Sequence, residues 1–135
     1  MGYTITTTLP RTYDDAVEAV RDALAEQGFG ILTEIDLRAT LLDKLGVEVA
    51  PQVILGACRP PLAHQALMID PSVATMLPCN VVVRALDADT SVVEALDPKV
   101  MVTLTQNEAL SSVAAEAGQR LAAALETLTH APAHS

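Results

Sequence analysis

Aromatic and basic residues are scarce in this sequence. Its 135 residues include no Trp, one Phe and two Tyr, and eight Lys and Arg stand against seventeen Asp and Glu, for a net charge of -9. A nucleic-acid-binding protein neutralises phosphates with clustered cations and stacks bases on aromatic rings. Because the basic residues are also scattered along the chain, we expect no nucleic-acid partner.

Long apolar runs are lacking too. The longest, such as the three valines at 81–83, fall far short of the ~20 residues that span a bilayer. Residues 1–10 lack the basic start and apolar core of a secretory signal. We therefore expect no membrane partner and a cytoplasmic location. In that reducing compartment, Cys58 and Cys79 should be thiols or metal ligands before they are a structural disulfide.

Hydrophobic residues are plentiful, at 50% of the chain, which is too many for a disordered protein. A length of 135 residues is close to the usual size of one domain. We expect a single domain over residues 1–129. Residues 130–135 show no hydrophobic periodicity and should form a flexible tail.

Hydrophobic periodicity and helix-capping residues predict the order of elements. Thr12 and Asp15 form a capping box before an apolar helical stripe, and Gly28 is placed to end that helix. Asp36 and Gly46 cap a second helix in the same way. The patterns predict strands at 3–9, 31–36, 52–58, 79–86 and 91–96, helices at 13–27, 37–45 and 60–69, a helical turn at 72–77 and a hairpin turn at 87–90.

The last third of the chain contains one ambiguous segment and one long helix. Residues 98–104 alternate like a strand, whereas Asp97 and Pro98 can start a helical turn. Thr105 and Glu108 form another capping box, which predicts that the long C-terminal helix begins there. Its apolar face consists of Leu110, Val113, Ala114, Ala117, Leu121, Ala124, Leu125 and Leu128.

Several short segments occur together in one order: GFGILTEID at 28–36, KLG at 44–46, CRP at 58–60, DP at 70–71 and LPC at 77–79. Together they resemble the domain of unknown function 302 family over nearly the whole chain. The resemblance implies a small bacterial or archaeal α+β domain, with a mainly antiparallel sheet of about five strands backed by helices. Arg59 departs from the family pattern, in which Asn is more usual before Pro60, and the pattern carries over no catalytic residue.

Cys58, His64 and Cys79 form the one cluster of thiol and imidazole side chains, the groups from which zinc and copper sites are built. Structural zinc ligands usually lie two to four residues apart, and this spacing is absent, so we assign no metal, no cofactor and no catalytic residue. Four roles are open for the cysteines. They are small buried hydrophobes, they form a metal or redox site, they form a disulfide, or Cys58 acts as a nucleophile near Arg59. We keep the three residues as ligand-binding candidates.

The two cysteines should lie close together whatever their role. The strand that ends at Cys58 and the strand that begins at Cys79 are joined by a helix and a helical turn, which let the chain go out and return. That connection predicts antiparallel neighbours, with both cysteines at the same end of the sheet.

The expected function is that of a non-enzymatic module that binds a small molecule or forms a homodimer. Apolar residues on both faces of the middle strands, and alanines outside the main stripe of the last helix, indicate surface that a ligand or a second copy would cover. The alternative is a metal- or thiol-dependent redox protein that uses Cys58 and Cys79. The surface residues in question are Ile54, Gly56, Cys58, Cys79, Val81, Val83, Ala115, Ala122 and Ala123.

Overall fold

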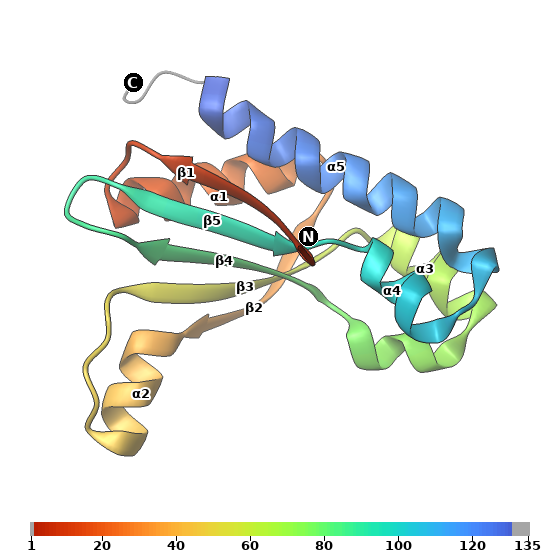
Figure 1. The fold of residues 1–135 in the computed structure, drawn as a ribbon, viewed down its shortest axis with the longest axis horizontal. Helices are drawn as coiled ribbons and strands as arrows, with labels where there is room; N and C mark the ends of the chain where they lie inside the picture. Colours follow the sequence, from red (N-terminus) through yellow and green to blue (C-terminus); the bar gives the residue numbers. More distant parts are fainter. Residues whose placement is uncertain (1, 131–135) are drawn as a thin grey trace.

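The five strands that the structure describes belong to one sheet, and every neighbouring pair is antiparallel (Figure 1). The computed structural model describes residues 2–130, so the tail predicted at 130–135 lies, apart from its first residue, outside the described residues. The elements in chain order are β1 (Thr4–Leu9), α1 (Tyr13–Glu26), β2 (Gly30–Asp36), α2 (Leu37–Leu45), β3 (Gln52–Cys58), α3 (Pro60–Ile69), η1 (Pro71–Met76), β4 (Cys79–Ala85), β5 (Ser91–Leu96), α4 (Lys99–Thr105), η2 (Glu108–Leu110) and α5 (Ser111–His130).

The strands lie in the order β1-β5-β4-β3-β2. Consecutive strands β1 and β2 therefore occupy opposite edges, and α1 connects them across the sheet. The interior strands β3, β4 and β5 follow one another along the chain. This arrangement confirms the predicted α+β class, and α5 is the predicted long C-terminal helix.

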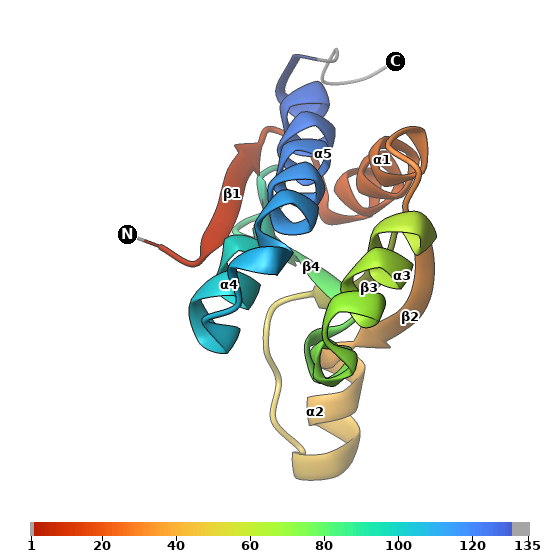
Figure 2. The same cartoon turned by 90° about the vertical axis from the view of Figure 1, so that its right-hand side faces the viewer.

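The hydrophobic core lies between the sheet and two helices, α1 and α5, which pack on the same face (Figure 2). Side chains alternate between the two faces of a strand. On the helix-covered face, Ala95, Val81 and Leu55 are register partners across β5, β4 and β3, and all three are fully buried. The other face, which we call the open face, points away from α1 and α5, and α2 projects from the sheet on that side (Figures 1 and 2).

A second hydrophobic cluster lies beyond one end of the sheet, among α3, η1, α4 and the start of α5. Its largest buried members include Leu62, Met101 and Leu110. The cluster holds the short α4 against α5, and this placement creates the cleft described below. None of the helices in residues 2–130 is both long enough and apolar enough to cross a lipid bilayer.

The start of the last helix differs from the prediction. Thr105 is the final residue of α4, and its hydroxyl donates to the Met101 carbonyl oxygen, so it does not cap α5. Asn107 accepts a hydrogen bond from the Ala109 backbone amide instead, which starts η2 before α5 begins at Ser111. The ambiguous segment 98–104 is helical, because α4 occupies it.

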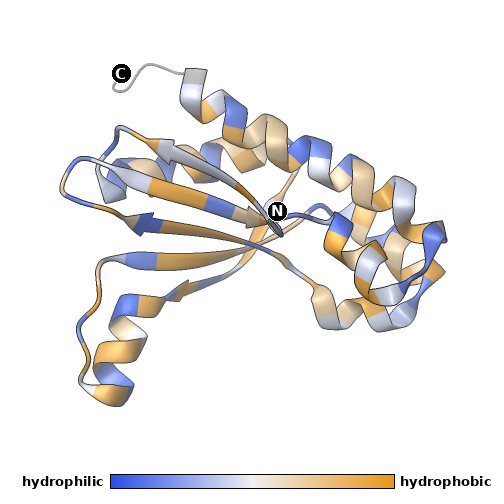
Figure 3. Cartoon of the chain, viewed as in Figure 1, coloured by the Kyte–Doolittle hydropathy of each residue, from blue (hydrophilic) through white to orange (hydrophobic). Residues whose placement is uncertain are grey.

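Four apolar residues lie in surroundings other than those that the sequence patterns predicted: Tyr3, Leu45, Val81 and Val83. Tyr3 and Leu45 are exposed, because β1 begins after Tyr3 and α2 buries none of its residues. Val81 and Val83 face the helices and are fully buried, so Val82 accompanies Ile54 on the open face. Figure 3 shows apolar residues along α2 as well as along the strands.

Candidate functional site

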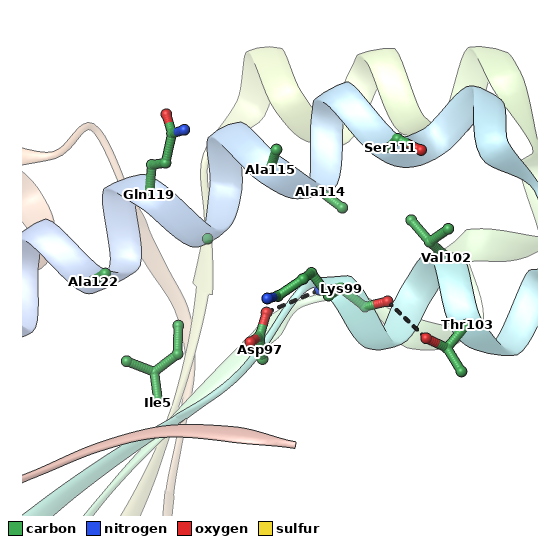
Figure 4. Close-up of a pocket in the computed structure, with 11 residues that line it drawn as sticks. Ile5, Asp97, Lys99, Val102, Thr103, Ser111, Ala114, Ala115, Gln119 and Ala122 are labelled. Atoms are coloured by element: carbon green, nitrogen blue, oxygen red, sulfur yellow. Dashed lines mark hydrogen bonds between the residues drawn. The ribbon is translucent and has the colours of Figure 1, made fainter. Parts of the chain in front are cut away.

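A cleft with a volume of about 640 Å³ lies between β1, α4 and α5 (Figure 4). We call it the α5 cleft. Small-molecule sites have volumes of roughly 300–1,000 Å³, so this cleft is large enough for an organic ligand. Its apolar walls are formed by Ile5, Val102, Ala114, Ala115, Gly118 and Ala122.

Small side chains on α5 create the space. Gly118 lies four residues from Ala114 and Ala122 and three residues from Ala115, the spacing that puts residues on the same face of a helix. A Cβ atom added at Gly118 would lie 3.7 Å from Cδ of Pro98, which is ordinary van der Waals contact. Longer side chains along this face would close the cleft against α4.

Polar groups line the same cleft, and most of them already have partners. The Asp97 carboxylate accepts a hydrogen bond of 3.0 Å from the backbone amide of Lys99, the first residue of α4. The Thr103 hydroxyl donates to the Lys99 carbonyl oxygen, and the Ser111 hydroxyl donates to the Glu108 carbonyl oxygen. These bonds keep both α4 and the start of α5 in place around the cleft.

Lys99 is the cation of the α5 cleft. Its ammonium group makes no ion pair with any residue that the structure describes, although its side chain lies beside Asp97 (Figure 4). The Asp97 carboxylate is engaged with backbone at the start of α4. The cleft therefore combines apolar walls with one positive charge that an anionic ligand group can neutralise.

The two cysteines lie together, as the predicted antiparallel connection requires. Cys79 at the start of β4 pairs in register with Ala57, the residue before Cys58 at the end of β3. Both cysteines are free thiols and line the same cavity. This cavity measures about 30 Å³ and has an almost wholly apolar lining, so it has room for one water molecule and not for an organic ligand.

The environment of Cys79 does not favour thiol chemistry. Burial raises the pKa of the Cys79 thiol, and the neighbouring Cys58 raises it further. A nucleophilic or metal-binding cysteine acts as the thiolate, and a raised pKa leaves this thiol protonated at neutral pH. The redox alternative therefore gains no support over a binding function.

His64 is not brought to the cysteines. It lies on the exposed side of α3 and lines neither the thiol cavity nor the α5 cleft. Within residues 2–130, no three His, Cys, Asp or Glu residues gather in a group that could hold a metal ion. The cluster of Cys58, His64 and Cys79 expected from the sequence is thus split between a buried pair and a surface imidazole.

Sequence reasoning missed the α5 cleft. The pattern of residues 98–104, which include Lys99, is compatible with either a strand or a helix. Ala115 and Ala122 were interpreted as surface that a second copy covers. A signal was present: small residues recur along one face of the last helix at 111, 114, 115, 118 and 122. That pattern alone does not reveal which element stands opposite.

Comparison with known proteins identifies the family. The family model "Domain of unknown function DUF302" matches residues 5–128. A crystal structure of an uncharacterized conserved protein DUF302 from Bacillus stearothermophilus is similar, with a TM-score of 0.88 and 28% sequence identity over 95% of this chain and 99% of that chain. No curated protein matches. A family match over nearly the whole sequence, together with the shared fold, shows that the chain belongs to the DUF302 family.

Proposed function

We propose that the protein is a non-enzymatic module that binds a small molecule in the α5 cleft. The observation that carries this proposal is the combination of a 640 Å³ volume, mainly apolar walls and the Lys99 ammonium group that lacks an ion pair among the described residues. Sites for small molecules are typically apolar, with a few polar groups that orient the ligand. The ligand is accordingly a largely apolar molecule with one acidic group.

The non-enzymatic part of the proposal is supported by the surroundings of the Cys79 thiol. Cysteine is the strongest nucleophile that the sequence offers, yet burial holds the Cys79 thiol in its protonated form. We also propose a cytoplasmic setting, because both cysteines are free and free thiols persist in reducing compartments.

Binding of a fluorescent anion tests the proposed function. Anilinonaphthalene sulfonate has an apolar ring system and one negative charge, so its fluorescence should rise when it enters the α5 cleft. Ala115→Leu places a larger side chain in the cleft at a position where leucine keeps helix propensity, and it should abolish the signal. The control is Ala25→Leu on α1, which is also exposed and lies outside the cleft.

Substitution of Lys99 separates charge recognition from apolar binding. Lys99→Gln should lower the affinity for the sulfonate probe about fivefold, which corresponds to ~1 kcal/mol for a partly exposed ion pair. The neutral analogue phenylnaphthylamine should bind both forms equally. Fluorescence titrations that are unchanged by Ala115→Leu would contradict the assignment of the ligand site to this cleft.

A further inference from the structure

The open face of the sheet is divided into a polar half and an apolar half. One row of register partners crosses all five strands: Thr6, Glu94, Val82, Ile54 and Ile35, from β1 to β2. The Thr6 hydroxyl donates to the Glu94 carboxylate, which also forms an ion pair with Arg84. The polar groups on the β1 side of the row therefore have partners within the chain. The β2 side of the row is aliphatic and has no such polar network.

The helix α2 lies beside this apolar half and is itself uncovered. Its ends are well formed, because the Asp36 carboxylate accepts from the Ala39 amide and Gly46 adopts the left-handed conformation. Yet none of its nine residues is buried. Isolated helices shorter than about 12–15 residues are marginal in water. The contacts of α2 with β3 and β2 leave most of its residues exposed, so a further surface would stabilise it.

Exposed aliphatic side chains gather on and around α2. We call this group the α2 surface: Ile35, Leu42, Leu45 and Val47, of which Leu45 is 69% exposed. Exposed aliphatic side chains that lie near one another are typical of an interaction site. Because α2 projects on the same side of the sheet as the open face (Figures 1 and 2), one chain presents both a protruding apolar helix and an uncovered apolar sheet surface.

Charge favours a second copy as the occupant. The chain has a net charge of -9, so two copies repel each other over most of their surfaces. In contrast, α2 carries Arg38 and Lys44 against the single acid Asp43, and neither cation has an ion pair in the part of the chain that the structure describes. The charge of this helix therefore offsets part of the repulsion when it approaches a second copy.

We propose that the α2 surface of one copy packs on the apolar half of the open face of a second copy, and that the partner makes the same contact in return. A two-fold dimer requires a self-complementary surface, and the protruding helix and the uncovered sheet face together supply one. The contact lies on the other side of the sheet from the α5 helix and does not depend on ligand binding in the α5 cleft.

Molar mass in solution tests the proposal directly. Light scattering coupled to gel filtration should give twice the 14.2 kDa chain mass for the unmodified protein at about 200 µM, since dimers are favoured by concentration. Leu45→Glu should raise the dimer dissociation constant at least about tenfold, because a charge would enter an apolar contact. The matched control is Leu104→Glu on α4, where the leucine is 68% exposed and the dimer should persist.

A second variant tests the other side of the contact. Val82→Thr keeps the side-chain shape and strand propensity but places a hydroxyl on the open face, and it too should weaken the dimer while circular dichroism remains unchanged. A monomeric unmodified protein at about 200 µM, or a Leu45→Glu variant as dimeric as the control, would overturn the proposal. Binding of anilinonaphthalene sulfonate in the α5 cleft should be unaffected by either substitution.

Discussion

The Nε atom of Arg59 donates a hydrogen bond of 3.0 Å to the carbonyl oxygen of Gln27. Gln27 is the C-terminal cap of α1, where carbonyl groups lack partners within the helix. The same guanidinium group lies 3.9 Å from the Glu116 carboxylate on α5. One side chain at the start of α3 thus connects three helices.

Loss of this side chain should destabilise the fold. We expect Arg59→Ala to lower the free energy of unfolding by about 1–2 kcal/mol, because the Gln27 carbonyl oxygen loses a charged donor. Urea denaturation followed by circular dichroism measures the change. Lys99→Ala is the control, since that cation has no ion pair among residues 2–130, and it should change the value by less than about 0.5 kcal/mol. Equal stabilities for the two variants would disprove the role of Arg59.

Gly56 in β3 should not tolerate a side chain. A Cβ atom there would lie 2.2 Å from the Thr33 hydroxyl oxygen and 2.8 Å from Cγ of Pro78, so neighbours on both sides would have to move. We expect Gly56→Ala to cost about 1–3 kcal/mol through overpacking. Gly30→Ala is the control, because a Cβ atom at position 30 would lie 3.9 Å from its nearest neighbour, the Cys58 carbonyl oxygen. The thermal unfolding temperature of this variant should change little. A Gly56→Ala protein as stable as the Gly30→Ala protein would show that the strands adjust freely.

The Glu94 carboxylate should contribute a pH-dependent part of the stability. The hydrogen bond from Arg84 is the main cause that holds the pKa of Glu94 below its ordinary value of 4.5, and the hydroxyls of Thr6 and Thr4 add to it. A lowered pKa in the folded state means that this contribution is complete above pH 4.5 and is lost as the pH falls through the folded-state pKa.

Urea denaturation of the unmodified protein and Glu94→Gln from neutral pH to about pH 3 measures this contribution. The two proteins should differ most at neutral pH, and the difference should shrink as the pH falls below 4.5. A difference that stays constant over the whole range would rule out the ionised carboxylate as its source.

The Cys79 thiol should react slowly in the folded protein. Burial raises its pKa, so little thiolate is present at neutral pH, and the side chain lies against a 30 Å³ cavity. In a Cys58→Ser background, alkylation by iodoacetamide should be at least about tenfold slower than in the urea-unfolded chain. Mass spectrometry follows the reaction. Equal rates in the two states would reopen a redox role for this cysteine.

Local signals were enough to predict most of the secondary structure. Glycine was expected to end the first two helices in the left-handed conformation, and Gly28 and Gly46 have φ angles of 85° and 68°. Asp36 caps α2 as predicted. These features depend on a few adjacent residues, so their physical causes are visible in the sequence.

The α5 cleft depended on information that is not local. Ile5, Lys99 and Ala122 line it, and they are brought together because β1 occupies the sheet edge next to β5 and because residues 98–104 form a helix. Helix and strand patterns were equally compatible with that segment. Contacts with Met101 and Leu110 in the second hydrophobic cluster accompany the helical choice, and such tertiary contacts override local propensity.

The placement of β1 has a consequence for how the chain is made. Among the described strands it pairs with β5 alone, and 90 residues separate Thr4 from the Glu94 side chain that it meets there. During synthesis β1 leaves the ribosome long before β5 exists, so it stays without its partner strand while the chain from α1 to β4 is made. Contacts so distant in sequence slow folding. The threonines that alternate along β1 keep one side of the unpaired strand polar, which limits its tendency to pair with other nascent chains.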